Sequence, residues 1–206
     1  MIRRHRLPVS ICLSVLLVAA VAASLRATVG GPTTIRLLGV DRATGRVFYL
    51  NDPPYGERPA LRVRGFDPDA AGLPAWEEVP LWDADTAEKD LPLIRRSIEA
   101  FRRTLEPLVP FSPSRWEMAV EVLLEAAHES FCMGGTVPRY ETRVVLTADG
   151  MKATFDVTGY CDRAASVLGW YRVPGDPGAA VIEFAFTGDP FETCYTTVVP
   201  VVLRAP

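Results

Sequence analysis

Four glutamates and one histidine in the segment 115–130 have spacings that suit a metal site on a helix: Glu117, Glu121, Glu125, Glu129 and His128. The sequence Glu-x-x-His within this segment presents two ligands one helical turn apart, as in carboxylate-bridged di-iron bundles. Such a bundle needs a second Glu-x-x-His, but the only other histidine of the chain is His5, at the extreme N-terminus. We therefore expect no bound metal here and interpret the acidic stripe as the solvated face of an amphipathic helix.

Three cysteines follow the N-terminal segment: Cys132, Cys161 and Cys194. This is an odd number for a compartment in which disulfides form. If the last five strands form a meander, the strand ending at Tyr160 and the strand starting near Cys194 meet at one end of the sheet. This arrangement favours a Cys161–Cys194 disulfide and leaves Cys132 free. Two alternatives stay open: three free buried thiols, and a zinc site of three cysteines with His128, although the usual closely spaced cysteine pair is missing.

Nucleophilic catalysis has little support in the sequence. A serine or cysteine nucleophile requires a base, and His128 is the only histidine beyond the extreme N-terminus. The turns Asp67–Gly72 and Asp83–Thr86 resemble pieces of calcium-binding loops, but neither supplies a complete set of ligands. We predict no catalytic residue and no cofactor, and we keep a hydrolase that uses paired carboxylates as the alternative.

The N-terminus carries the features of an export signal. Three arginines precede the uncharged run Leu7–Leu25, and small residues up to Ala23 suit signal peptidase. Residues 1–23 are therefore expected to be a signal peptide. An uncleaved anchor is the alternative, because 19 uncharged residues can just span a bilayer. In both cases the rest of the chain is expected outside the cytoplasm, in the periplasm, at the cell surface or secreted.

The composition and net charge of the chain restrict the kinds of partner that it is expected to bind. Loss of residues 1–23 leaves 183 residues and changes the net charge from −3 to about −6, because the segment contains three arginines and no acidic residue. This length suits one domain, 33–206. A mildly acidic body without a basic block argues against nucleic acid. No second apolar run is long enough to span a membrane, and an envelope protein or a glycan stays open as the partner.

The segment 33–83 is expected to form β-hairpins. Short runs rich in β-forming residues are separated there by turn residues, such as Gly45 in "RATG". The next segment, 90–131, is expected to form a helical hairpin. Its first helix is predicted from an apolar stripe that begins at Leu91 and continues to Leu108, with Asp90 as the N-cap.

The second predicted helix contains the acidic stripe. Ser114 and Glu117 have the spacing of a capping box, and apolar residues from Trp116 to Phe131 form the opposite face. The connection between the two helices is short, so they are expected to be antiparallel neighbours. Arginines of the first helix are then expected to lie beside the glutamates of the second and to reduce their mutual repulsion.

Residues 139–204 are expected to form an antiparallel sheet. Asp149-Gly150 is the strongest signal for a two-residue hairpin. Pairing outward from this turn predicts an apolar face of Ala148 with Met151, Leu146 with Ala153 and Val144 with Phe155, and a polar face of Thr147 with Lys152 and Arg143 with Asp156. The run "AAVIEFAF" is apolar at both parities, as a strand buried on both faces requires.

Together these segments predict an α+β domain, in which an antiparallel two-helix hairpin packs on antiparallel β-sheet after an N-terminal signal sequence. Most aromatic residues of the predicted strands and loops are expected in the core, and one or two exposed on a sheet would form a platform for sugar or peptide. These residues are Phe48, Tyr49, Tyr55, Trp76, Trp82, Trp170 and Tyr171. The function predicted is an exported, non-catalytic binding or structural domain of the cell envelope. The alternative is a carboxylate-dependent hydrolase of the envelope.

Overall fold

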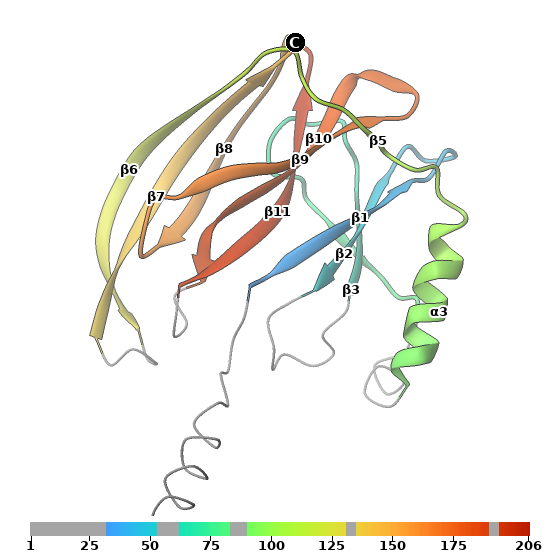
Figure 1. Ribbon diagram of the computed structural model, residues 1–206, viewed down its shortest axis with the longest axis horizontal. Helices are drawn as coiled ribbons and strands as arrows, with labels where there is room; N and C mark the ends of the chain where they lie inside the picture. Colours follow the sequence, from blue (N-terminus) through green and yellow to red (C-terminus); the bar gives the residue numbers. More distant parts are fainter. Residues whose placement is uncertain (1–31, 53–61, 83–89, 131–134, 190–193) are drawn as a thin grey trace, which may run out of the picture.

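The computed structural model describes residues 32–52, 62–82, 90–130, 135–189 and 194–206. Within these ranges the chain forms eleven strands and one helix (Figure 1). Their bounds are β1 Thr34–Val40, β2 Val47–Asp52, β3 Arg62–Phe66, β4 Glu77–Val79, α3 Leu91–Arg102, β5 Val109–Pro110, β6 Trp116–Ser130, β7 Gly135–Ala148, β8 Met151–Tyr160, β9 Ala165–Val173, β10 Asp176–Asp189 and β11 Tyr195–Arg204. The one described helix is too short to cross a bilayer. The expected signal peptide, residues 1–23, lies outside the described residues.

The strands form two antiparallel sheets. The smaller sheet has the order β1-β2-β3-β4, and the larger has the order β5-β9-β10-β11-β8-β7-β6. Within the larger sheet, β11 and β8 share one registered pair, Arg204 with Lys152. The larger sheet is therefore open between β8 and β11, and β6–β8 fold over β9–β11. Phe155 of β8 meets Phe184 of β10 edge to face, with their ring centroids 5.0 Å apart.

The strands β10 and β11 form the central layer and are apolar on both faces. On one side, Val181 and Val202 pack against Val47 and Phe66 of the smaller sheet. On the other side, residues of the opposite parity, such as Ile182, pack against β7 and β8. The prediction that the "AAVIEFAF" strand is buried on both faces is confirmed, because its side chains enter two separate cores.

The helix α3 covers the far face of the smaller sheet (Figure 1). Ile94 and Ile98 are buried there with apolar residues of β1–β3. The predicted N-cap is confirmed, because the backbone N–H of Leu93 donates to Asp90 Oδ1 at 2.8 Å. The predicted extension of the helix to Leu108 is wrong. The chain leaves the helix after Arg102, and the backbone groups of Glu106 exchange hydrogen bonds of 2.8 Å with Val40 at the end of β1.

The second predicted helix is wrong, and with it the α+β class. Residues 116–130 form β6, a strand paired with β7 along its whole length. The described chain is therefore mostly β, with two sheets and a single short helix instead of a helical hairpin. Ser114 does not cap a helix. Its N–H and hydroxyl, with the N–H of Arg115, donate to the carboxylate of Asp149 in the β7–β8 turn. These bonds direct the chain along β7.

The predicted β7–β8 register is confirmed at every pair. Ala148 lies opposite Met151, and the apolar pairs continue to Val144 and Phe155, which enter the core. Asp149 and Gly150 have φ values of 46° and 83°, which the two central residues of such a turn require. On the polar face, Arg143 donates to Asp156 through Nε at 2.9 Å and Nη2 at 3.0 Å.

Candidate functional site

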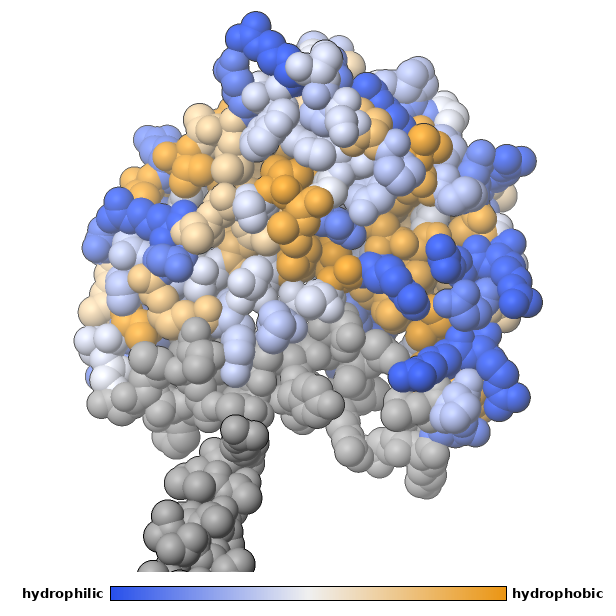
Figure 2. All heavy atoms as spheres, in the orientation of Figure 1, coloured by the Kyte–Doolittle hydropathy of each residue, from blue (hydrophilic) through white to orange (hydrophobic). Residues whose placement is uncertain are grey.

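A cavity of about 440 Å³, partly open to solvent, lies between the smaller sheet and β11. The elements meet here because the backbone N–H of Val198 in β11 donates to the carbonyl of Thr33 at 3.0 Å, which holds β1 beside β11. Figure 2 shows apolar residues gathered in the middle of this face of the molecule, with strongly hydrophilic residues mostly toward its edges. The cavity volume is within the range of small-ligand sites.

The strand β2 supplies the inner wall of the cavity. Its alternation turns Val47, Tyr49 and Asn51 toward the larger sheet, whereas Phe48 and Leu50 join the core under α3. Along this wall the residues change from apolar to polar. Val47 is fully buried, and Tyr49 and Asn51 are 2% and 9% exposed. The core between the sheets therefore ends in polar side chains that face the cavity.

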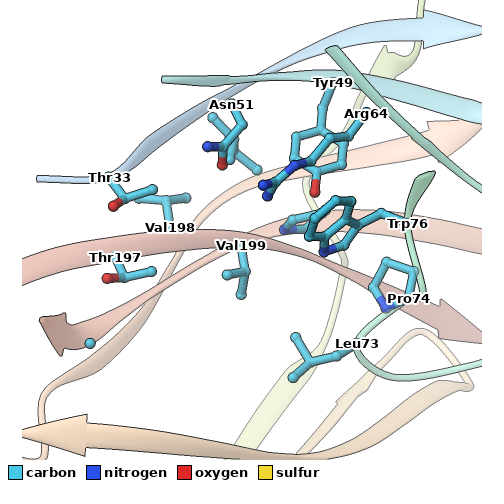
Figure 3. A pocket seen from close by; sticks show the side chains of 13 residues that line it. Thr33, Tyr49, Asn51, Arg64, Leu73, Pro74, Trp76, Thr197, Val198 and Val199 are labelled. Carbon is cyan, nitrogen blue, oxygen red and sulfur yellow. The ribbon is translucent and has the colours of Figure 1, made fainter. Parts of the chain in front are cut away.

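Arg64 of β3 projects into the cavity beside Tyr49, which is its partner in the β2–β3 register. Figure 3 shows the guanidinium between the Tyr49 side chain and the indole of Trp76. The centre of the guanidinium is 3.5 Å from the centroid of a Trp76 ring, a close cation–π stack. Burial raises the pKa of the Tyr49 phenol, and the interaction with Arg64 opposes this shift.

Arg64 is partly buried and lacks the carboxylate partner that such an arginine normally has. Its Nε is buried and has no hydrogen-bond partner. Among the side chains that the structure describes, no carboxylate lies within 4.0 Å of its guanidinium. Glu78 is directly opposite Arg64 in the β3–β4 register, but it pairs with Arg62 at 3.3 Å. A partly buried cation without a carboxylate partner among the described side chains is therefore left in the cavity wall.

The outer lip of the cavity comes from the β3–β4 connection. Leu73, Pro74 and Trp76 line it, and Trp76 is 47% exposed. The connection is fixed at Gly72, whose N–H and carbonyl form hydrogen bonds of 2.8 and 2.9 Å with the backbone of Val202. Gly72 has a φ of 116°, and a Cβ there would lie 3.1 Å from a backbone oxygen. Glycine thus allows the close contact that positions the lip.

The glutamate stripe is divided between the two faces of β6. Glu121 lies opposite Arg143, but after a bulge between Val122 and Leu124 the next glutamate, Glu125, lies opposite Tyr140. Arg143 and Tyr140 are three residues apart on β7, so the two glutamates point to opposite sides. The predicted single stripe is therefore wrong.

The glutamates also have other partners than those expected. Glu117 pairs with Arg115 and Glu125 with Arg163, each at 2.6 Å, instead of with arginines of the first helix. His128 packs on the ring of Tyr160 with centroids 5.0 Å apart. Within the described ranges, no three His, Cys, Asp or Glu side chains gather as metal ligands.

The structure brings Cys161 and Cys194 to disulfide distance, with their Cα atoms 6.0 Å apart. The reason differs in part from the expected five-strand meander, because the sheet neighbour of β8 is β11 and not β9. The end of β8 and the start of β11 still meet at one edge. Cys132 and the segment Asp83–Thr86 lie outside the described residues. In the other candidate calcium turn, the Asp67 carboxylate is 3.6 Å from Arg46.

No Asp or Glu is among the described residues that line the cavity. The half-buried Glu183 lies elsewhere, and its hydrogen-bond partner is Tyr171 Oη at 3.3 Å, not a second carboxylate. Burial raises the pKa of Glu183, and the hydrogen bond from Tyr171 partly offsets this. The hydrolase alternative requires two acids about 5–10 Å apart in a cleft. Nothing in the described cavity lining favours it.

Sequence reasoning identified part of this site. Tyr49 and Trp76 were among the candidate aromatics, but Arg64 and Asn51 were not identified. The signal was present in β3, where the run "RVRGF" alternates and turns Arg64 to the opposite side from buried Val63.

Comparison of the chain with protein-family models, with curated proteins and with solved structures finds no match. The fold and the cavity therefore define the class of protein by themselves: a two-sheet antiparallel β domain, with one covering helix in its described part and a cationic, aromatic cavity between the sheets.

Proposed function

We propose that the chain is an exported, non-catalytic binding domain that takes its ligand into the cavity between the smaller sheet and β11. One observation carries the proposal: Arg64, stacked on the exposed Trp76, lines the cavity without a carboxylate partner among the described side chains. An aromatic and arginine pair of this kind is typical of the residues that dominate binding energy. The disulfide-distance pair Cys161 and Cys194 agrees with a location outside the cytoplasm.

A binding role fits the chemistry of the lining better than catalysis does. The described lining has one cation, a phenol, an amide and hydroxyl groups, but neither a carboxylate nor a histidine to act as a general base. These groups can orient a ligand, and the described lining lacks the carboxylate and histidine bases that most often activate water. The ligand is therefore expected to leave the protein chemically unchanged.

The test is a fragment screen by NMR on the purified ¹⁵N-labelled protein, followed by titration of the hits. Binders are expected to shift the indole N–H resonance of Trp76, and Trp76→Leu is expected to lower their affinity at least tenfold. Trp116→Leu is the matched control, because Trp116 is 46% exposed and does not line the cavity. Equal loss of affinity in both variants, or hits that map away from Trp76, would contradict the proposal, as would conversion of the ligand during the titration.

A further inference from the structure

The charge of the cavity identifies the class of ligand. Arg64 supplies a guanidinium to the cavity, and the described lining holds no acidic residue to pair with it. The neighbouring arginines differ from it in this respect. Arg46 pairs with Glu77 at 3.0 Å and Arg62 with Glu78 at 3.3 Å. Arg64 thus stands out among these three arginines as the one whose charge the described side chains leave without an ion pair.

The geometry around Arg64 restricts the shape of an anion that can pair with it. Trp76 covers one face of the planar guanidinium at 3.5 Å and the Tyr49 side chain lies on its other side (Figure 3), so a ligand approaches in the plane of the donors. The Nε of Arg64 is closed off inside the protein, so the Nη groups are the donors within reach of a ligand, and a planar group with two oxygens can accept from two guanidinium N–H groups at the same time. A carboxylate has this form. Tyr49 and Asn51, on the adjoining strand, add polar groups beside it.

The remaining walls suit an apolar or aromatic body. Leu73, Pro74 and Val199 face the cavity together with the indole of Trp76. A volume of about 440 Å³ accommodates a ring and its substituents as well as the charged group. Apolar walls with a few fixed polar groups are the usual composition of a small-ligand site.

We propose that the ligand of this cavity is a small carboxylate with an aromatic or apolar body, whose carboxylate pairs with Arg64 while its body lies against Trp76 and the β3–β4 connection. The proposal rests on the binding function proposed above and assigns its ligand class. Free carboxylic acids and the C-terminal carboxylate of a short peptide share this chemistry.

The test is isothermal titration with matched probes. N-acetyl-phenylalanine carries the carboxylate, N-acetyl-phenylalaninamide is its neutral counterpart, and a dipeptide ending in phenylalanine distinguishes a peptide end from a free acid. The acid is expected to bind wild type at least tenfold more tightly than the amide. Arg64→Gln is expected to abolish this preference, and Arg64→Lys, which keeps the charge but loses the planar fork, to retain only part of it. Arg42→Gln is the control and is expected to keep the full preference, because Arg42 is exposed, pairs with Glu106 and does not line the cavity.

The outcomes separate the ligand class from the binding function. If the acid and the amide bind equally and Trp76→Leu weakens both, the cavity binds ligands but the carboxylate assignment is overturned. Tighter binding of phenyl phosphate than of the acid also overturns it, in favour of a phosphate. Absence of binding for every probe in the folded wild type overturns the ligand class, and the fragment screen then decides the binding function independently. If Arg64→Gln does not fold, the acid-to-amide comparison in wild type and in Arg64→Lys still tests the proposal.

Discussion

Replacement of both Cys161 and Cys194 by alanine is expected to lower the free energy of unfolding by about 3–4 kcal/mol. The two residues close a loop with a sequence separation of 33. For a loop of this length the chain-entropy relation gives a loss of about 12.5 cal/mol/K in the unfolded ensemble, which is about 3.7 kcal/mol at 25 °C. The disulfide also adds a second link between β8 and β11. The strands β8 and β11 share their registered backbone pair, Arg204 with Lys152, at the opposite end.

Backbone conformation adds a second, opposite contribution. Cys161 and Cys194 have φ values of 67° and 57°, in the left-handed region that side chains with a Cβ disfavour. Occupying this region costs about 1–2 kcal/mol per residue, and glycine relieves it while losing about 0.4–1 kcal/mol per residue through unfolded-state entropy. The double glycine variant is therefore expected to be about 1–2 kcal/mol more stable than the double alanine variant, although less stable than the oxidised wild type.

Urea unfolding, followed by tryptophan fluorescence, measures both differences. Reduced wild type is the matched reference for the alanine variant, because it lacks the bond but keeps both residues. Cys132→Ser is expected to leave the unfolding midpoint unchanged, since Cys132 is predicted to be free. Two results would refute the reasoning: an equal midpoint for oxidised wild type and the alanine variant, or a crosslink to Cys132 in peptide maps made without reduction. A glycine variant less stable than the alanine variant would refute the strain argument alone.

Three further predictions use the same unfolding assay. Burial raises the pKa of Glu183, so the folded state retains the Glu183 proton to higher pH than the unfolded state. The stability that protonation provides is lost as the pH rises from the ordinary glutamate range through the folded pKa. Glu183→Gln should therefore gain stability relative to wild type between pH 4 and pH 7, and a constant difference would contradict this. Gly72→Ala should cost about 1–3 kcal/mol, because φ is 116° and the new Cβ would lie 3.1 Å from the Thr154 carbonyl oxygen; a neutral effect would mean that the β3–β4 connection moves freely. Phe184→Ala should cost about 3–5 kcal/mol, because the ring is fully buried and packs on Phe155; a loss below about 1 kcal/mol would mean that the core collapses around the cavity.

The sequence predicted those features that depend on neighbouring residues. Asp149-Gly150 determines a two-residue turn, and this turn determines the register of β7 and β8 without reference to the rest of the chain. The Asp90 cap is equally local, because the bond runs from the side chain to an N–H three residues ahead. Such features need no knowledge of what packs against them, which is why they were predicted correctly.

The sequence of β6 predicts a helix wrongly because its pattern fits the period of a helix as well as that of a strand. A spacing of four is close to one helical turn, but it is also an even number and keeps residues on one face of a strand. The apolar residues Trp116, Val120 and Leu124 have the same spacing, so the helical template fits them too. Pairing with β7 along the whole strand determines the outcome, and the bulge between Val122 and Leu124 removes the strict alternation that would have revealed it.

The sequence does not predict the cavity, for a different reason. Its described lining runs from Thr33 to Pro200 and comes from both sheets, so no local pattern contains it. Alternation in β3 shows that Arg64 and Val63 point to opposite sides, but it does not reveal which side β11 covers. Whether Arg64 has an ion pair also depends on which arginine Glu78 pairs with. Glu78 pairs with Arg62, although it lies opposite Arg64 in the register.

The same packing makes the cavity a continuation of the core. Val47, Tyr49 and Asn51 project from one face of β2, and only the last two meet the cavity. The strands on both sides are already fixed by the buried contacts at the Val47 end, and the lip is fixed by the bonds between Gly72 and Val202. A ligand therefore meets walls that need little ordering on binding, so that less of its interaction energy is lost to conformational entropy. Arg64 has no carboxylate partner among the described side chains, so an ion pair with its guanidinium is the main electrostatic gain that a ligand can provide.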